Sequence, residues 1–535
     1  MTKGARRGGL PRRWGLCGAL LLGSAWAVVG PTQEELNRAD EATDSWLMYN
    51  KGYKGQRYSP LEQINTENVA GLRRLCTFDT GDDGGFQVTP QVYKGVIFFT
   101  QMYRTFAIDA TTCKPLWTHK HLTEDSSVLT TNRGLAIADG VLYRGTPDAR
   151  LIALDAGTGR ELWNTKVEDS SVGYFLSSAP IYYDGKVYIG DAGADWGIKA
   201  KMYAFDAKTG QKAWSFDLIP TGNQLGADTW KRADATVTGG GSVWTSYTLD
   251  PQSGKLYFSV GNPAPDFAAQ YRPGDNLFTN TVTVLDARTG QYSHHYQQIP
   301  NDDKDYDTAA APVLYDLGGE RRLAVATKAG WLFGYDDSQQ TQAFKQPMIK
   351  VTNQEKPTTR EGLAICPNYS AGSQWSGPSY HAANATLVVP AVDWCGVVKL
   401  GEVRLIKGQL FFGGAMQLDP AEKAIGNVVA FDALSGREIW RYSTPGIRII
   451  GGLTTTAGNL VLGGAMNGTL FALDARSGKV LFKDNVDKAL IGGGVSTYLV
   501  NGKQYLAVAA GNTSKGAVGS GSKNVTGRIA IYALP

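Results

Sequence analysis

The stretch Ala153-Leu-Asp-Ala-Gly-Thr-Gly-Arg-Glu-Leu-Trp163 decides the fold, because close copies of it recur along the chain. In each copy, alternating apolar residues predict a strand, Asp begins a turn, Gly supplies a positive φ and an aromatic residue opens the next strand. The clearest copies run from Ala204 to Trp214 and from Ala430 to Trp440. Weaker copies run from Ala107 to Trp117, from Val284 to His294 and from Ala472 to Phe482, and Gly334-Tyr-Asp336 is a worn copy.

The spacing of these copies predicts the architecture. The Asp of the phrase recurs after 46 residues between Asp109 and Asp155, and after 51 residues between Asp155 and Asp206. Each interval holds about four short strands, which is one blade of a β-propeller. Seven copies and a terminal strand over 529–534 predict an all-β, eight-bladed β-propeller closed by pairing of the two chain ends. A blade cannot bury both its faces alone, so we expect residues 28–535 to form one propeller, with the Trp residues of the phrase wedged between neighbouring blades.

Composition and charge narrow the function classes. The 535 residues are 42% hydrophobic and 19% charged, which is typical of a folded protein. The net charge is +4, but residues 1–27 hold five basic residues and no acid, so the remainder carries a net charge of −1. A basic surface that would bind nucleic acid is therefore not expected in residues 28–535.

The first 27 residues have the pattern of a secretory signal peptide. Residues 1–13 are basic, and an apolar run over 14–30 contains the small-x-small sequence Ala25-Trp26-Ala27. Cleavage before Val28 and export to the periplasm are expected, with an uncleaved anchor as the alternative. No later stretch is apolar enough to span a membrane, so no integral membrane domain is expected.

Four cysteines remain once Cys17 leaves with the signal peptide. An even number in an exported chain favours disulfides. We predict that Cys76 pairs with Cys113 and Cys366 with Cys395, because each pair flanks adjacent strand patterns. No Cys-x-x-Cys-His occurs, so a covalently attached c-type haem is not expected.

Several motifs, together with the repeated phrase, resemble the pyrroloquinoline quinone (PQQ)-dependent, or quinoprotein, alcohol and methanol dehydrogenases. They are Tyr58-Ser-Pro-Leu-Glu-Gln-Ile-Asn65, Asn132-Arg133-Gly134 and Gly452-Leu-Thr-Thr-Thr-Ala-Gly458. The resemblance extends over nearly all of the mature chain. It implies an eight-bladed propeller with PQQ-type repeats that binds PQQ and one metal ion, either Ca²⁺ or a lanthanide.

The resemblance implies a metal site made of Asp195, Asn262, Asp305 and Asp307. Asp195 stands where the family has a Glu, one methylene longer, and Asp307 matches an extra carboxylate of lanthanide-using members. Carboxylate and amide oxygens are suitable ligands for a hard cation. By the same resemblance, Asp305 is the general base.

The resemblance also implies the residues that hold the quinone. Trp244 would be the flat surface on which PQQ stacks, and the backbone of Gly193 and Ala194 would approach the quinone. Lys328 matches a cation near the quinone carbonyls, Arg133 a residue that contacts the cofactor carboxylates and Ser177 a hydroxyl donor. Each of these residue types alone is more often structural, so the prediction depends on finding them together.

Four positions depart from the family pattern. Ser127-Val128 stand where many members have two adjacent cysteines. Gln87 replaces a Glu, Lys304 replaces a Trp before the base, and Ile450 stands where a Trp is frequent.

The implied activity is the oxidation of a small alcohol. Asp305 would take the hydroxyl proton while hydride passes to metal-bound PQQ, and a separate soluble cytochrome c would take the electrons. Two alternatives stay open: a non-catalytic scaffold or assembly protein of the export compartment, and a sugar or aldose dehydrogenase decided by loops near residues 362–379.

Overall fold

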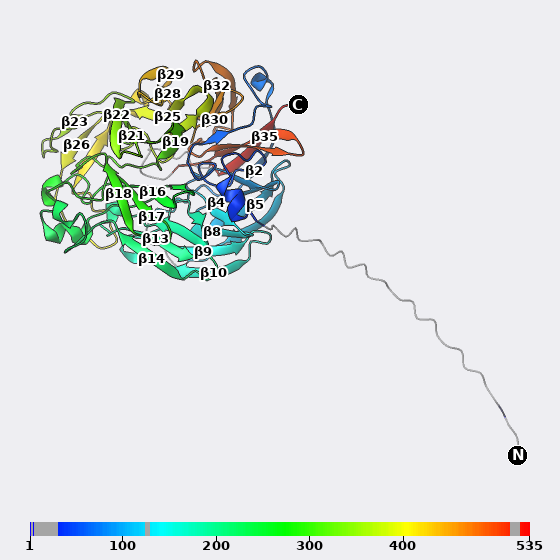
Figure 1. Ribbon diagram of the computed structural model, residues 1–535, viewed down its shortest axis with the longest axis horizontal. Coiled ribbons are helices and arrows are strands. Elements are labelled where there is room, and N and C mark those ends of the chain that lie inside the picture. The colour runs from blue at the N-terminus through cyan, green and yellow to red at the C-terminus, as the bar shows by residue number, and fades with distance from the viewer. Residues whose placement is uncertain (2–3, 5–29, 124–128, 514–524) are drawn as a thin grey trace.

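The computed structural model describes residues 1, 4, 30–123, 129–513 and 525–535. Apart from residues 1 and 4, the predicted signal peptide lies outside these ranges, as does the pair Ser127-Val128. Figure 1 shows sheets arranged around a ring, with strands from the two ends of the chain close together. None of the helices in the described ranges is both long and apolar enough to cross a membrane.

Eight sheets of four or five strands make up the ring. The first four are β3–β6 (Gln91–Tyr93, Val96–Gln101, Arg104–Asp109, Pro115–Lys120), β7–β10 (Ala136–Ala138, Val141–Gly145, Arg150–Asp155, Glu161–Lys166), β11–β14 (Ile181–Tyr183, Lys186–Gly190, Lys201–Asp206, Lys212–Asp217) and β15–β18 (Tyr247–Asp250, Lys255–Val260, Thr281–Asp286, Tyr292–Gln297). The next two are β19–β22 (Val313–Leu317, Glu320–Ala326, Trp331–Asp336, Thr341–Pro347) and β24, β25, β28 and β29 (Ser379–His381, Thr386–Asp393, Ile425–Asp432, Glu438–Pro445). The last two are β1 with β30–β33 (Tyr58–Ser59, Thr454–Thr456, Leu460–Gly464, Thr469–Asp474, Val480–Asn485) and β2 with β34–β36 (Arg73–Asp79, Val495–Val500, Lys503–Ala510, Arg528–Ala533).

These sheets confirm the all-β propeller, and their number is consistent with the eight blades predicted. The first strands of neighbouring sheets contact one another, for example β7 with β11, β15 with β19 and β34 with β3. First strands such as β3 and β11 are buried, whereas last strands such as β6 and β14 are largely exposed. The first strands therefore line the inside of the ring. The two chain ends meet in one sheet, where β2 pairs antiparallel with β36, as predicted.

The repeated phrase forms the outer turn of each blade and the contact with the next one. In the third sheet, Asp206 Oδ1 accepts hydrogen bonds from the Thr209 backbone N–H (2.8 Å) and hydroxyl (2.7 Å). Trp163 of the preceding sheet donates from its indole N–H to Ala207 O at 3.1 Å. Trp117, Trp214 and Trp440 make the same bond to Ala156, Ala287 and Ala475 of the sheets that follow them. These Trp residues therefore hold neighbouring blades together, as predicted.

A glycine in the phrase makes room for this indole. Gly159 has a φ of +73°, and a Cβ added to it would lie 2.5 Å from Trp117 Cε3. The left-handed turn and the close approach of the ring both require glycine at this position.

Both predicted disulfides are present. Cys76 in β2 pairs with Cys113, which follows β5, so this bond joins the sheet that holds both chain ends to the first sheet. Cys366 pairs with Cys395 next to a ninth, three-stranded sheet of β23, β26 and β27 (Leu363–Ile365, Gly396–Leu400, Gly414–Leu418).

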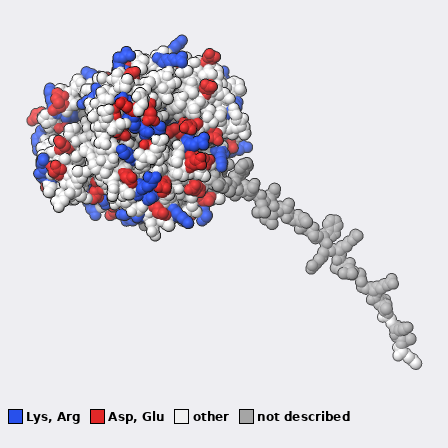
Figure 2. Space-filling view, in the orientation of Figure 1, with Lys and Arg blue, Asp and Glu red and all other residues white. Residues whose placement is uncertain are grey.

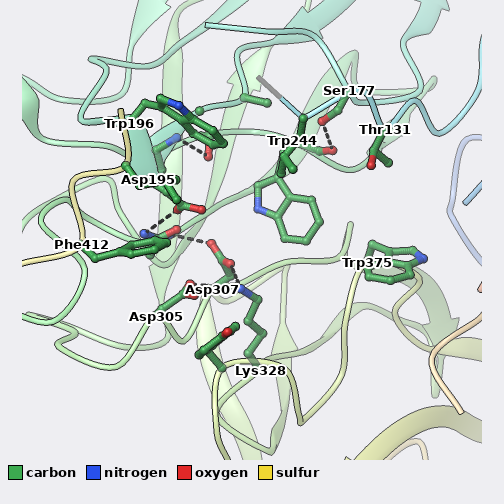
Figure 3. Close-up of a pocket in the computed structure, with 18 of the residues that line it drawn as sticks. Thr131, Ser177, Asp195, Trp196, Trp244, Asp305, Asp307, Lys328, Trp375 and Phe412 are labelled. Carbon is green, nitrogen blue, oxygen red and sulfur yellow. Dashed lines mark hydrogen bonds and ion pairs between the residues drawn. The ribbon is translucent and has the colours of Figure 1, made fainter. Parts of the chain in front are cut away.

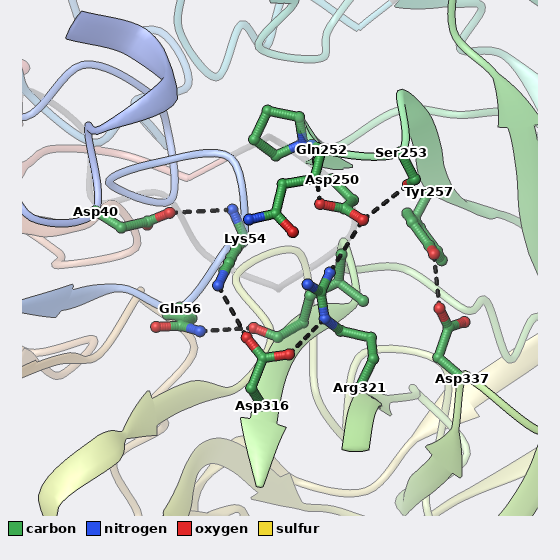
Figure 4. Close-up of polar contacts among 12 residues, drawn as sticks. Asp40, Lys54, Gln56, Asp250, Gln252, Ser253, Tyr257, Asp316, Arg321 and Asp337 are labelled. Carbon is green, nitrogen blue, oxygen red and sulfur yellow. Dashed lines mark hydrogen bonds and ion pairs between the residues drawn. The ribbon is translucent and has the colours of Figure 1, made fainter. Parts of the chain in front are cut away.

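The N-terminal segment is tied to the ring by charged and polar contacts (Figure 4). It contains the only α-helix of the described ranges, α1 (Gln33–Asn37), and eight short 3₁₀ helices lie elsewhere in the connections. Lys54 Nζ contacts Asp316 at 3.0 Å, and Arg321 bridges Asp316 (2.7 Å) to Asp250 (3.2 Å).

Acidic and basic side chains are interspersed over the face of the molecule shown in Figure 2.

Candidate active site

The predicted site residues lie on loops at one end of the blades. Because neighbouring strands are antiparallel, the connection that enters a first strand and the connection that leaves a second strand emerge on the same face. Arg133, Ser177, Trp244, Asp305 and Asp307 precede first strands. Gly193, Ala194, Asp195, Asn262 and Lys328 follow second strands. Blade topology thus places all ten predicted residues on one face.

All ten residues line one pocket of about 460 Å³ (Figure 3). Figure 3 shows the side chains of Asp195, Asp305 and Asp307 on one side of the Trp244 ring and Trp375 on the other. The structure therefore brings together residues that are up to 195 positions apart, from Arg133 to Lys328.

The acidic side of the pocket is held by short contacts between its loops. Asp307 Oδ1 accepts a hydrogen bond from the Asn262 backbone N–H at 2.7 Å, and Asn262 Nδ2 lies 3.3 Å from Asp195 Oδ1. A Cβ on Gly261 would lie 2.3 Å from Asp307 Oδ1, so glycine at this position permits the approach. Asp305 has a left-handed backbone (φ 58°), which Asp tolerates better than most residues.

Lys328 is the cation closest to these carboxylates. Its Nζ lies 3.0 Å from Asp305 Oδ1 and also contacts Asp307 Oδ2. Burial lowers the pKa of Lys328, but Asp305 and Asp307 outweigh burial and the net shift is upward, so this ammonium stays charged. The sequence placed Lys328 near the quinone; the structure also makes it the counter-ion of two predicted metal ligands.

The surroundings of Asp195 and Asp305 disfavour the ionised form of these carboxylates. Burial, followed by the charge of Asp307, raises the pKa of Asp195 to about 6. Burial also raises the pKa of Asp305 well above its ordinary value, and Asp307 and Asp195 add to the shift while Lys328 opposes it. Buried acids with raised pKa values, gathered in a cavity, are typical of catalytic or metal-binding sites.

Asp266 belongs to the acidic cluster but was missed by the sequence analysis. One oxygen each of Asp195, Asp266 and Asp305 lie within 4.8 Å of one another. Asp307, which was predicted as a ligand, lies outside this group of three and is engaged by Asn262 and Lys328. The signal available in the sequence was the position of Asp266 four residues after Asn262 on one loop.

The aromatic side of the pocket is built around Trp244. Arg133 and Ser177 both donate hydrogen bonds to the carbonyl oxygen of Trp244, at 2.7 and 3.0 Å. The Arg133 guanidinium lies 4.5 Å from the centre of the Trp244 ring, and Lys328 Nζ lies 5.6 Å from it. Two cations therefore face one indole, an arrangement suited to a flat anionic ligand.

Two further parts of the wall were not predicted residue by residue, although the first lies in the loops near residues 362–379 that the sequence analysis expected to decide the substrate. Trp375 packs with Ile450, and its indole N–H donates to Gly492 O at 2.8 Å. Leu410 and Phe412 come from the segment before β27, and the Phe411 backbone N–H donates to Asp195 O at 2.6 Å. Their sequences carry no periodic or motif signal, because they line the pocket only after the ring has formed.

A β-propeller with a buried carboxylate cluster beside a flat aromatic surface defines a class of cofactor-binding enzymes, and comparisons with known proteins specify the family. The family model described as the glucose/ethanol/alcohol dehydrogenase beta-propeller domain matches residues 46–339. A second, described as outer membrane protein assembly factor BamB, matches residues 424–519.

Relatives and solved structures agree with the first family model. Quinoprotein alcohol dehydrogenase PedH of Pseudomonas putida is 30% identical over 96% of this chain and 93% of its own. The lanthanide-dependent methanol dehydrogenase of Methylacidiphilum fumariolicum is 28% identical over 95% of this chain and 90% of its own. A europium-containing methanol dehydrogenase structure superposes with a TM-score of 0.86 at 27% identity, covering 94% of this chain and all of that one. The chain belongs to the PQQ-dependent, quinoprotein alcohol dehydrogenase family.

Proposed function

We propose that this protein is a PQQ-dependent dehydrogenase that oxidises the CH–OH group of a small alcohol. The observation that carries the proposal is the convergence of ten residues from seven separate connections on one pocket. They are Arg133, Ser177, Gly193, Ala194, Asp195, Trp244, Asn262, Asp305, Asp307 and Lys328.

The donor set fits PQQ and one metal ion. Trp244 offers a flat face, and Arg133 and Lys328 offer cations for the carboxylates and carbonyls of PQQ. Asp195, Asn262, Asp305 and Asp307 offer carboxylate and amide oxygens for Ca²⁺ or a lanthanide. When bound, PQQ supplies a quinone that accepts a hydride equivalent and the metal supplies a Lewis acid.

Asp305 is the residue proposed to take the hydroxyl proton of the alcohol. Its carboxylate lies in the pocket, and its raised pKa makes it a stronger base than an exposed aspartate. Lys328, 3.0 Å away, favours the ionised form of Asp305 and opposes the effects of burial and of the neighbouring acids. Trp196, Leu410 and Phe412 add apolar side chains to the lining of the same pocket.

The composition of the wall favours an alcohol over a sugar. Leu129, Phe267, Leu410, Phe412 and Met416 are all apolar. A polyhydroxylated substrate needs several hydrogen-bond partners, and burying its hydroxyls against apolar side chains would cost binding free energy. From residues 362–379, the wall receives Tyr369, Gln374 and Trp375.

The scaffold alternative has less support. The match to the assembly factor model covers residues 424–519, which include none of the ten site residues. A structural role alone would not require a carboxylate cluster beside two cations and an indole.

The remaining parts of the proposal concern compartment and electron transfer. We propose that residues 1–27 are removed as a signal peptide, and that residues 28–535 act as one propeller in the periplasm. A separate soluble cytochrome c would then accept the electrons, since the chain has no haem-attachment motif.

Reconstitution tests the proposed function. Purified protein would be incubated with PQQ and either Ca²⁺ or La³⁺, and quinone absorbance and dye-linked oxidation of ethanol would be measured. We expect PQQ binding and turnover with at least one of the metals. Failure to bind PQQ with either metal would overturn the enzyme assignment.

A further inference from the structure

We propose that Asp266 is a ligand of the cation in this pocket, although it lies outside the ligand set implied by the family resemblance. The inference rests on the proposed function, because that function places a cation beside Asp195 and Asp305. It adds a fourth carboxylate to the site and assigns a role to a side chain that is otherwise unexplained.

The geometry of the cluster suits one ion. Oxygen ligands lie about 2.3–2.6 Å from Ca²⁺, so two ligands of the same ion are at most about 4.6–5.2 Å apart. One oxygen each of Asp195, Asp266 and Asp305 lie within 4.8 Å of one another. Separations of this size allow one cation to lie among the three carboxylates.

Asp266 is buried without a partner. Its exposed fraction is 0%, and within the part of the chain that the structure describes neither of its carboxylate oxygens has a hydrogen-bond partner. The carboxylates of Asp316 and Asp337 in Figure 4, by contrast, are each bound by cationic or hydroxyl groups. An unpaired buried carboxylate is costly, and a bound cation removes that cost.

The two nearby cations are committed elsewhere. Lys328 pairs with Asp305 and Asp307. Arg272, which is also buried, donates to the backbone oxygens of Pro265, Asp266 and Asp302 and to the side chain of Asn276. Burial, Asp195 and Asp305 raise the pKa of Asp266 well above its ordinary value, while Arg272 only opposes the shift.

Asp266 also compensates for a short ligand. Asp195 stands where the family has a Glu, so its carboxylate extends one methylene less toward the ion. Asp266, on the loop that follows Asn262, supplies another oxygen to the same ion. Four carboxylates around one site favour a trivalent ion over Ca²⁺, because the higher ion charge offsets more of their repulsion.

Eu³⁺ binding to the PQQ-loaded protein tests the assignment without relying on turnover. Luminescence lifetimes in H₂O and D₂O report how many water molecules coordinate the ion. We expect Asp266→Ala to add at least one coordinated water and to weaken Eu³⁺ binding at least tenfold. Asp266→Asn should weaken La³⁺ binding more than Ca²⁺ binding, since it removes one negative charge.

Two controls separate ligation from folding. Asp337→Asn changes another buried carboxylate, which is held by Tyr257 and Tyr296, and should leave Eu³⁺ hydration and affinity unchanged. The metal-free Asp266→Asn protein should melt at the same temperature as the metal-free wild type or higher, because a neutral amide cannot add to the charge of the neighbouring carboxylates.

The outcomes distinguish the two proposals. If the wild type binds Eu³⁺ and PQQ and oxidises ethanol, but Asp266→Ala has unaltered hydration and affinity, the Asp266 assignment is wrong and the proposed function stands. If the wild type binds neither Eu³⁺ nor PQQ, both are wrong.

Discussion

The outer turns of the blades and the central pocket contain the same residue types. Their polar groups have hydrogen-bond partners in the turns, but some of them lack such partners at the pocket. At the rim, Asp206 accepts two hydrogen bonds from Thr209, which lower its pKa. Beside the pocket, Asp266 has no hydrogen-bond partner among the described residues, and burial raises its pKa. Rim carboxylates are thus satisfied by their own turn, whereas pocket carboxylates depend on a cation or a proton.

The tryptophans show the same division. Trp163 packs on the next blade and donates its indole N–H to Ala207 O. Trp244 presents its ring to the pocket, where Arg133 and Lys328 face it. Residue type alone therefore does not identify a functional residue. Polar groups without hydrogen-bond partners and aromatic faces that line a cavity are better indicators.

Loss of the base should have the largest effect. Asp305→Asn removes the proton acceptor and keeps an oxygen ligand, so we expect kcat to fall at least about a hundredfold while PQQ stays bound. Steady-state oxidation of ethanol and the quinone absorbance of the same sample measure the two quantities. Wild-type rates in this variant would remove Asp305 from its catalytic role.

Replacement of the pocket indole, Trp244, should have the second largest effect. Trp244→Ala removes the stacking face, and we expect PQQ affinity to fall roughly tenfold to a hundredfold in an absorbance titration. The matched rim variant Trp163→Ala should lower the free energy of unfolding by about 2–3 kcal/mol and leave PQQ affinity unchanged. Equal losses of PQQ affinity in both variants would contradict the division between rim and pocket.

A smaller effect on stability is expected from replacing Gly159, the glycine that packs against the Trp117 indole of the preceding blade. Gly159→Ala places a methyl group 2.5 Å from Trp117 at a φ of +73°, and we expect a loss of about 2 kcal/mol in unfolding free energy. Gly185 has a φ of +74° and nothing within 4 Å of its added Cβ, so Gly185→Ala reports the backbone strain alone. Denaturant unfolding of both variants measures the difference, and equal losses would mean that the indole contact adds nothing.

The smallest effect should come from one turn carboxylate. Asp206→Ala removes two hydrogen bonds and is expected to cost about 1 kcal/mol at pH 7. The Thr209 side chain lowers the pKa of Asp206. The charge-dependent part of its stabilisation is therefore fully present above the ordinary Asp pKa of about 3.9 and is lost as the pH falls through the lowered value. Unfolding of the wild type and the variant between pH 2 and 7 should show this difference shrinking toward acid.

Much of the propeller could be predicted because its signals are local. The phrase from Ala153 to Trp163 contains its own strand, turn acceptor and glycine, and the indole contact repeats from blade to blade. The pairing of Cys76 with Cys113 was likewise predictable, since both flank adjacent strands.

The site was predicted in part. The proposed residues, including Asp195, Trp244 and Lys328, were predicted through motifs and resemblance, and they line one pocket in the structure. The structure also adds the ion pair of Lys328 with Asp305 and Asp307.

The sequence by itself determined the repeat, because an Asp that caps its own turn and a Trp that meets the next glycine need only neighbours at fixed spacing. Only the tertiary structure decided that Asp266 lies beside Asp195 and Asp305 and that Trp375 and Phe412 close the pocket. The physical reason is that ligation and burial depend on distances between loops of different blades, which no local pattern specifies.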